Sequence, residues 1–248
     1  MRPFIEIPAA DGTAEAIVAR PDEGSHPGVL LCIDAIGLRE RIQDMVDRIA
    51  SWGYVVLAPN TMYRSGTAAE TTPTTDLRDP EQRAAYGTIS AGYLAPLTSG
   101  AIDADLPYYL SALRGLDGVG DRPIGVTGYC MGAKFATRAA GLDATIAACG
   151  GFHGAGIATS DPDSPHLTLA GAKAAFVYGH ADHDRLNPLE DIARMDAMLA
   201  EHGLTARTAI YPDAPHGFTM SDTSSYQEAG AERHFTELRE LFDAELGA

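Results

Sequence analysis

The segment Gly128-Tyr129-Cys130-Met131-Gly132 places a cysteine between two glycines, directly after the apolar run Pro123–Thr127. This is the Gly-x-nucleophile-x-Gly pattern, in which a tight turn between a strand and a helix exposes the nucleophile. The glycines allow a strained turn and close packing of the strand against the helix. A helix that begins beside the sulfur favours a thiolate. The segment therefore predicts that Cys130 is a nucleophile, although 26 glycines in the chain make support from other segments necessary.

Two downstream segments supply groups that could serve this nucleophile. The apolar run Ala174–Tyr178 leads toward Asp182, and the run Ala209–Pro212 leads toward His216. A nucleophile, an acid and a histidine, in this order and each after a strand, is the chain order of α/β-hydrolases. We expect His216 to act as the general base and Asp182 to orient its ring. Asp184, two residues further on, is the alternative acid.

Length and charge limit the classes of function. A chain of 248 residues with 45% hydrophobic residues is long enough for one α/β domain with a substantial core. The formal net charge of −16 argues against nucleic acid and anionic membrane surfaces as partners. No apolar run is long enough to span a membrane, and Met1–Glu6 does not resemble a signal peptide. We expect a cytoplasmic monomer or homodimer that acts on a small molecule.

The three cysteines differ in their surroundings. Cys32 and Cys149 lie in apolar runs and are expected to be small buried hydrophobic residues. An odd number without a disulfide pattern fits a reducing compartment. Only Cys130 lies on a turn that leads into a helix.

The hydrophobic pattern predicts one α/β domain over residues 1–248. Its start, around Asp11-Gly12, has the pattern of a β-hairpin, and alternating strands and helices follow. We expect a mostly parallel central sheet of about eight strands with helices on both faces. The predicted strands are Phe4–Ile7, Glu15–Arg20, Val29–Ile33, Tyr54–Ala58, Ile124–Thr127, Thr145–Cys149, Ala174–Tyr178 and Arg207–Tyr211. The predicted helices are Ile42–Ile49, Ile102–Leu113, Met131–Ala140, Leu189–His202 and Gln227–Leu246.

One long stretch, Thr61–Asp79, is rich in Thr, Gly, Ala and Pro and shows no clear periodicity. A long loop within a compact domain is usually functional or mobile. Because it follows the end of a strand, residues 61–98 are a candidate lid or active-site loop region. Disorder without a function is the other interpretation.

The chain as a whole, up to about Phe242, resembles the dienelactone hydrolase family, whose members carry a Cys-Asp-His triad on an α/β-hydrolase fold. The matching segments are Gly128–Gly132, Gly179-x-x-Asp182, His216-x-Phe218, Asp34–Gly37 and Pro59–Arg64. The resemblance implies that Cys130, Asp182 and His216 form the triad.

Two positions depart from the family pattern. A glutamate that interacts with the resting cysteine is replaced here by Asp34, which either tunes the thiol or is a polar residue at a strand end. An arginine that holds the substrate carboxylate is replaced by Met220. The second carboxylate-binding arginine corresponds to Arg83, unless the local alignment places Gln82 there. These departures favour a less charged ester or lactone over dienelactone itself.

The further candidates for the substrate pocket are Ile36, Tyr86 and Arg64. Arg64 or Arg78 could also approach a substrate carboxylate from the long loop. The departures therefore leave open which arginine, if any, binds such a group.

The chemistry that we infer is acyl transfer to water. Cys130 attacks an ester, thioester or lactone carbonyl, the backbone N–H groups of Ala35 and Met131 hold the oxyanion, and a thioester acyl-enzyme is hydrolysed. No cofactor is required. The cluster His180–Asp184 lacks a recognised zinc-ligand spacing, so no metal is expected. The alternative is a hydrolase-fold binding protein or a thiol redox sensor with weak catalysis.

Overall fold

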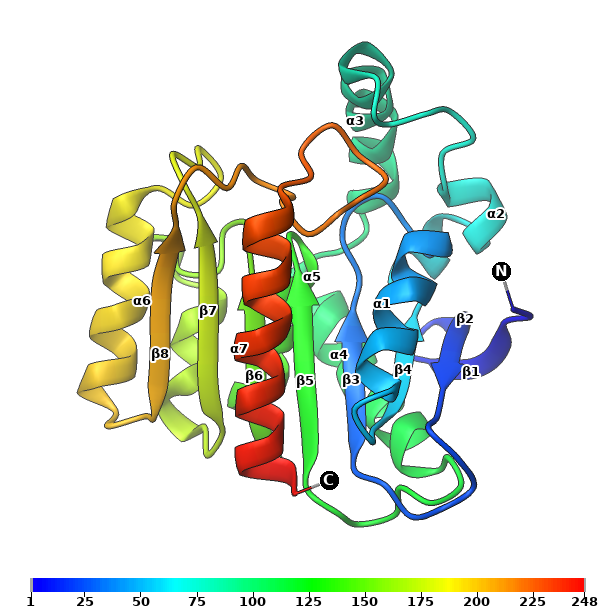
Figure 1. The fold of residues 1–248 in the computed structure, drawn as a ribbon, viewed down its shortest axis with the longest axis vertical. Helices are drawn as coiled ribbons and strands as arrows, with labels where there is room; N and C mark the ends of the chain where they lie inside the picture. The colour runs from blue at the N-terminus through cyan, green and yellow to red at the C-terminus, as the bar shows by residue number, and fades with distance from the viewer. Residues whose placement is uncertain (1, 248) are drawn as a thin grey trace.

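The computed structural model describes residues 2–247, which fold around a single eight-stranded sheet (Figure 1). The strand order is β1-β2-β4-β3-β5-β6-β7-β8. Two pairings, β1 with β2 and β2 with β4, are antiparallel, and the others are parallel. The mostly parallel sheet predicted from the sequence is therefore confirmed. The strands are β1 Ile5–Ala9, β2 Gly12–Ala19, β3 Gly28–Cys32, β4 Val55–Pro59, β5 Ile124–Tyr129, β6 Ile146–Phe152, β7 Ala175–Ala181 and β8 Ala206–Tyr211.

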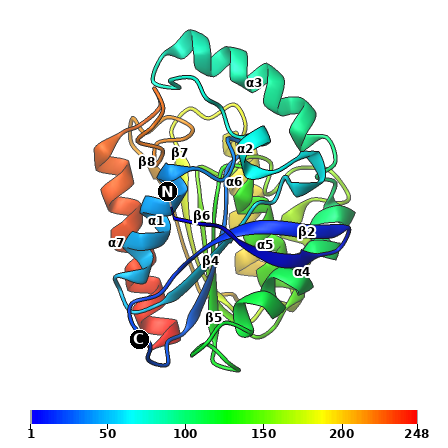
Figure 2. The ribbon, with the colours of Figure 1, turned by 90° about the vertical axis from the view of Figure 1, so that its right-hand side faces the viewer.

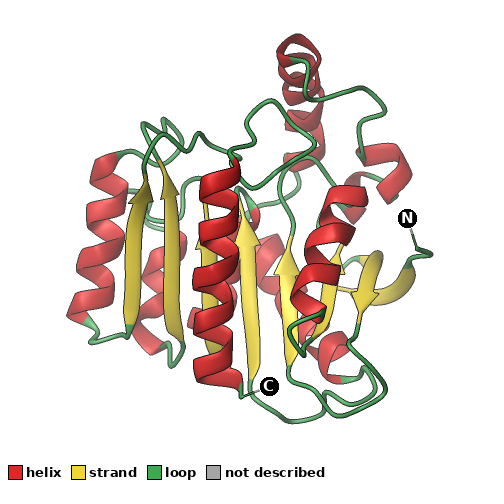
Figure 3. Cartoon of the chain, viewed as in Figure 1, coloured by secondary structure: helices red, strands yellow, loops and turns green. Residues whose placement is uncertain are grey.

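Helices cover both faces of the sheet, as Figures 2 and 3 show. On one face lie α1 (Glu40–Ala50) and α7 (Glu228–Leu246). On the other lie α4 (Ser99–Arg114), α5 (Gly132–Leu142) and α6 (Leu189–Glu201). Because crossover connections between parallel strands place helices outside the sheet, the inner strands are buried on both faces.

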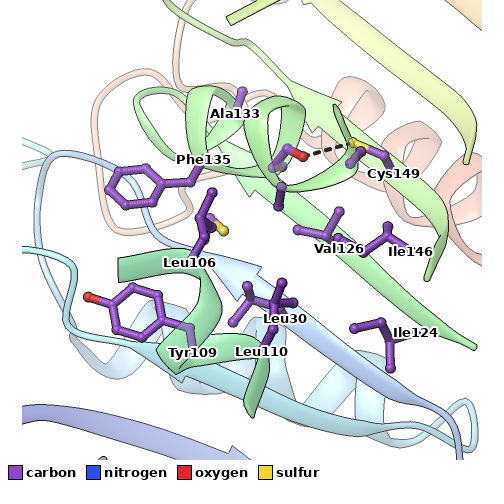
Figure 4. Packing of buried hydrophobic residues seen from close by; sticks show 14 of the residues in the cluster. Leu30, Leu106, Tyr109, Leu110, Ile124, Val126, Ala133, Phe135, Ile146 and Cys149 are labelled. Carbon is purple, nitrogen blue, oxygen red and sulfur yellow. Dashed lines mark hydrogen bonds between the residues drawn. The ribbon is translucent and has the colours of Figure 1, made fainter. Parts of the chain in front are cut away.

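Successive side chains along each strand point to opposite faces of the sheet, so the core has two layers. Leu30 and Val126 pack with α4 and α5, whereas Val29 and Leu31 pack with α1 and α7. Figure 4 shows the first layer, in which Leu106 of α4 and Phe135 of α5 meet the sheet. Cys149 lies in this layer, and its thiol donates to the carbonyl of Ala136. Cys32 and Cys149 are thus buried core residues, as expected.

Residues 61–98 contain more helix than the sequence pattern predicts. A 3-10 helix, η1 (Tyr63–Ser65), and a short helix, α2 (Ala68–Thr71), interrupt the stretch that we expected to be irregular. The unpredicted helix α3 (Pro80–Leu94) then runs across the carboxyl ends of the central strands (Figure 2). Only Tyr86 and Ser90 of α3 are buried, so the helix has no regular apolar stripe. Asp79 and Pro80 at its start are a capping signal that could have located it.

Within residues 2–247, no helix combines the length and the apolar sequence that crossing a membrane requires.

Candidate active site

Cys130 occupies the turn between β5 and α5. Its φ is 53°, in the left-handed region that most residues avoid. A Cβ on Gly128 would approach the carbonyl oxygen of Gly132 to 2.1 Å, and one on Gly132 would approach that of Cys32 to 2.2 Å. The two glycines are therefore required for the close packing of this turn. The N–H of Cys130 donates to Phe152 in β6 at 3.1 Å, which fixes the backbone beside the sulfur.

His216, in the loop after β8, lies against the sulfur. Its Nε2 is 3.1 Å from Cys130 Sγ, and its Nδ1 is 2.6 Å from Asp184 Oδ2. Burial disfavours a charged ring, but the hydrogen bonds to Asp184 and Cys130 outweigh burial and raise the pKa of His216 to about 10. The charged ring can stabilise a thiolate at Cys130.

The acid that contacts His216 is Asp184, so the prediction of Asp182 for this contact is wrong. The Asp184 side chain is 2% exposed, and its second oxygen accepts the N–H of Leu186. The backbone of the intervening His183 has a φ of 51°, a left-handed turn that redirects the chain after Asp182. A pattern with aspartates two residues apart does not reveal such a turn.

Asp182 instead holds the histidine loop. Its Oδ2 accepts the N–H of Asp213, and its own N–H donates to the carbonyl of Ala214. These hydrogen bonds connect the ends of β7 and β8 just before His216. Asp182 is therefore placed to support the loop and does not contact the imidazole.

The two expected oxyanion donors lie beside the nucleophile. Ala35 follows β3, and Met131 precedes the first residue of α5. Within residues 2–247, no hydrogen bond uses the N–H of either residue. Both amides are thus available to a bound oxyanion, which is the property that an oxyanion hole requires.

A pocket of about 390 Å3 opens beside Cys130 and His216. This volume suits a small organic molecule. Several loops and α3 form its walls, and the predicted residues Ile36, Arg83, Tyr86 and Met220 are among the lining residues. The lining residues are Asp34, Ala35, Ile36, Leu77, Pro80, Arg83, Ala84, Tyr86, Gly87, Ser90, Cys130, His153, Leu186, His216, Gly217, Met220, Thr223 and Ser224.

The arginines of the long segment have different positions. Arg83 lines the pocket, and no hydrogen bond or ion pair joins its side chain to any other residue in the described range 2–247. Arg64 binds Asp11 and Asp105, so its prediction as a pocket residue is wrong. Its guanidinium is paired instead with Asp105, whose buried carboxylate needs a counter-charge. Arg78 pairs with Asp76 at the surface.

Asp34 forms an ion pair that the sequence did not suggest. Arg39 donates to both carboxylate oxygens of Asp34, at 2.7 and 3.0 Å, and also binds Asp222 at 2.5 Å. The same guanidinium lies 3.5 Å from the sulfur of Met220. No hydrogen bond joins Asp34 to Cys130 in the described chain. The sequence left open whether Asp34 tunes the thiol or is a polar residue at a strand end, and its carboxylate is paired here with Arg39 and not with Cys130.

Tyr86 anchors α3 over the site. Its hydroxyl hydrogen-bonds to the carbonyls of Thr71, at 2.7 Å, and Ile36, at 3.0 Å. The pocket-lining helix is thereby joined to α2 and to the loop after β3. His153, which also lines the pocket, was not predicted as a site residue. Its place after an apolar run, next to Gly154, is the available signal.

Among residues 2–247, no three His, Cys, Asp or Glu side chains gather as candidate metal ligands. His180, from the cluster weighed as a metal site, hydrogen-bonds to Asn187 instead.

Comparisons with known proteins agree with the fold. A sequence model of the dienelactone hydrolase family matches residues 14–246. A protein of Salmonella typhi named as a carboxymethylenebutenolidase is 27% identical over 241 residues, which cover 95% of this chain and 84% of that protein. One of Synechocystis with the same name is 26% identical over 226 residues, covering 90% and 88%.

Solved structures with similar folds have lower identity. The structure of a protein from Klebsiella pneumoniae named as a dienelactone hydrolase has a TM-score of 0.81 at 22% identity and covers 96% of each chain. A dienelactone hydrolase-like promiscuous phosphotriesterase from metagenomic libraries has a TM-score of 0.80 at 18% identity and covers 98% of each chain. These structures share the α/β-hydrolase architecture. Because the family match extends over almost all of the sequence, the chain belongs to the dienelactone hydrolase family of hydrolases.

Proposed function

We propose that this protein hydrolyses a compact ester, thioester or lactone through nucleophilic catalysis by Cys130. The observation that carries the proposal is the chain of hydrogen bonds from Asp184 through His216 to Cys130 at the edge of a pocket. This is the arrangement of an acid, a base and a nucleophile that acyl transfer needs.

In the proposed reaction, the Cys130 thiolate attacks the carbonyl carbon, and a tetrahedral oxyanion forms. The N–H groups of Ala35 and Met131 donate to this oxyanion. Protonated His216 then gives its proton to the departing alkoxide or thiolate, which leaves a thioester on Cys130. Neutral His216 next takes a proton from water, the hydroxide attacks the thioester, and the acid product departs with return of the thiol to its resting state.

Asp184 has an orienting role in this scheme. By accepting a hydrogen bond from Nδ1, it holds Nε2 toward the sulfur and stabilises the ring when it is charged. Asp182 is no longer part of the proposed triad, because its carboxylate binds a backbone N–H elsewhere.

The pocket supports a small substrate that is mainly apolar. Ile36, Leu77 and Met220 contribute apolar side chains, and Arg83 is the only lysine or arginine among its described lining residues. One unpaired guanidinium could bind one carboxylate, but Met220 offers no second charge. A neutral ester or lactone, or one with a single carboxylate near Arg83, fits these walls.

The test is hydrolysis of p-nitrophenyl acetate by the wild type and by Cys130→Ala. We expect Cys130→Ala to lose thiol-dependent turnover and to keep its fold. Cys149→Ala is the matched control, because that thiol is buried in the core and should not affect the chemistry. Iodoacetamide should inactivate the wild type and Cys149→Ala alike.

The alternative, a binding protein or a thiol redox sensor, makes the opposite prediction. It would be favoured if wild-type protein showed no turnover of any ester or lactone in a screen while iodoacetamide still modified Cys130. Wild-type activity in Cys130→Ala would also overturn the proposed mechanism.

A further inference from the structure

A hydrogen bond from a side chain to the backbone closes the turn that follows β3. Asp34 Oδ1 accepts the N–H of Ile36 at 3.1 Å, so the carboxylate spans Ala35, the residue between them. Aspartate and asparagine favour this arrangement, because their short side chains reach the N–H two residues further on. The hydrogen bond restricts the two peptide groups that flank Ala35, and the first of them carries the Ala35 N–H.

Two other side chains hold the same loop. The carbonyl of Ile36 accepts the hydroxyl of Tyr86 at 3.0 Å, and the carbonyl of Gly37 accepts an N–H of Arg39 at 3.1 Å. Gly37 has a φ of 103°, which favours glycine. The loop is therefore fixed by side chains of α3 and of the residue before α1.

Arg39 also fixes the direction of the Asp34 carboxylate. Its guanidinium donates to Oδ1 at 2.7 Å and to Oδ2 at 3.0 Å, and both residues are buried. A pair with two hydrogen bonds leaves the carboxylate little freedom to rotate. Pairing with Arg39 accounts for a carboxylate at this position, and the hydrogen bond to Ile36 is a second use of the same Oδ1 atom.

The N–H of Ala35 is the group of this loop that the proposed chemistry uses. Ala35 and Cys130 line the same pocket, and within residues 2–247 that N–H makes no hydrogen bond. A Cβ on Gly132 would lie 2.2 Å from the carbonyl oxygen of Cys32, so the end of β3 packs directly against the turn that carries Met131. A donor stabilises an oxyanion best when it is already oriented, because no reorganisation is then needed in the transition state.

We propose that Asp34 is a positioning residue for the oxyanion hole: its carboxylate, oriented by Arg39, keeps the N–H of Ala35 in place for the oxygen that becomes negative when Cys130 attacks. This proposal rests on the proposed hydrolase function and deepens it. Asp34 acts through the backbone by accepting the N–H of Ile36. Its charge is balanced by Arg39 and does not tune the thiol.

The experiment compares Asp34→Asn with Asp34→Leu. Both variants lose the negative charge and keep a side chain of similar size, but only asparagine retains an oxygen that can accept the N–H of Ile36. That oxygen stays at the Oδ1 position, because Ile36 and Arg39 both donate there. In both variants Arg39 keeps Asp222 as its counter-charge.

If Asp34→Leu does not fold, the same two substitutions are compared together with Arg39→Met. Replacing both members of a buried ion pair by uncharged groups is often neutral for stability. The comparison between asparagine and leucine then still differs only in the acceptor for Ile36.

Three quantities are measured on each folded protein. The inhibition constant of 1,1,1-trifluoro-2-hexanone reports on the oxyanion hole, because the Cys130 thiolate forms a C–S bond with the ketone carbon and the carbonyl electron pair moves to the oxygen. The kcat for p-nitrophenyl acetate reports on the same hole during turnover. The rate of alkylation by iodoacetamide reports on the thiolate alone, since that displacement forms no oxyanion.

We expect Asp34→Leu to raise the inhibition constant of the ketone and to lower kcat, each by about tenfold to a hundredfold, as for a displaced oxyanion donor. Asp34→Asn should stay within about threefold of the wild type in both quantities, because it keeps the hydrogen bond to Ile36. Iodoacetamide should alkylate all three proteins at rates within about twofold of one another.

Equal ketone inhibition and equal kcat in the two variants would show that the acceptor on Asp34 does not position Ala35, and would overturn this proposal. Alkylation slowed in both variants as much as kcat would assign Asp34 to the thiol, which also overturns it. Either result leaves the hydrolase function standing. Absence of thiol-dependent ester hydrolysis by the wild type would overturn the hydrolase function, and this proposal with it.

Discussion

The two aspartates that follow β7 have separate tasks, although only one residue lies between them. Asp184 is buried against the imidazole of His216, and Asp182 binds the backbone of the loop that carries that histidine. Asp184 therefore orients the proposed base, while Asp182 stabilises the loop that contains this base.

We predict that Asp184→Asn lowers kcat by roughly two to four orders of magnitude, because the amide would favour the wrong tautomer of His216. Asp182→Asn is the matched control. Its side-chain oxygen can still accept the N–H of Asp213, so its activity should stay within about tenfold of the wild type. Steady-state kinetics on p-nitrophenyl acetate decides between the two. A small loss of kcat in Asp184→Asn together with a large loss of kcat in Asp182→Asn would contradict the assignment.

The sequence located most of the proposed site, but it did not identify the acid. Cys130 and His216 were found because each follows a recognisable strand in a fixed chain order. The choice between the aspartates depends on the left-handed turn at His183, and non-glycine residues adopt this conformation too rarely for the sequence to predict it. Arg39 was missed for a similar reason, since its partner Asp222 lies 183 positions away in the sequence.

The charge on His216 makes stability depend on pH. The folded pKa of about 10 lies above the ordinary value of 6.5, because hydrogen bonds to Asp184 and Cys130 outweigh burial. The paired ring therefore stabilises the fold fully below about pH 6.5, and this contribution is lost as the pH rises toward about 10. We predict that the free-energy advantage of wild type over His216→Gln shrinks over that range.

Urea unfolding of both proteins, with a reductant present, measures this difference. A constant difference in unfolding free energy between about pH 6 and about pH 10 would show that His216 is not held in its charged form.

At the scale of elements, a buried arginine joins two loops behind the pocket. Arg39 connects Asp34, after β3, to Asp222, in the loop between β8 and α7. Asp34 and Arg39 are 2% and 7% exposed, so neither charge has much access to water. Their pairing fixes one wall of the pocket, next to Met220.

We predict that Arg39→Met destabilises the protein by about 3–5 kcal/mol, since it leaves Asp34 buried without its counter-charge. The double variant Asp34→Asn with Arg39→Met should recover part of this loss. Arg78→Met, which removes an arginine from a surface ion pair, should change stability little. Urea unfolding at neutral pH provides the comparison. Equal effects of Arg39→Met and Arg78→Met would contradict the role of the buried pair.

Elements with a strong hydrophobic pattern were predicted well, and the others were not. The inner strands are buried on both faces, so their apolar runs could be recognised. α3 lies across the carboxyl ends of the central strands, with one side open to solvent. Its residues include two glycines and few large apolar side chains. Its position over the pocket depends on tertiary contacts such as the hydrogen bonds of Tyr86.

At the scale of the whole molecule, the net charge of −16 opposes the approach of anionic substrates. The positive charge of Arg83 attracts an anionic substrate only at short distances. We predict that a carboxylated ester is hydrolysed with a lower kcat/KM than its neutral counterpart at low salt. Raising the ionic strength from about 0.01 M to about 0.15 M should increase kcat/KM for the carboxylated ester only, because it screens the long-range repulsion.

Arg83→Gln is the control for the local contact and should reduce kcat/KM for the carboxylated ester by roughly tenfold or more, with little effect on the neutral one. A decrease in kcat/KM for the carboxylated wild-type substrate on adding salt would mean that a positive local field governs its approach.

The position of α3 has a consequence for how such a protein can diversify. The groups of the proposed chemistry project from the ends of β5, β7 and β8, whereas much of the pocket wall belongs to a helix inserted between β4 and α4. Because only Tyr86 and Ser90 of that helix are buried, its other pocket-lining residues can be substituted without repacking the sheet. New substrate ranges can therefore arise by mutation or directed evolution of this one insertion while the reacting groups stay fixed.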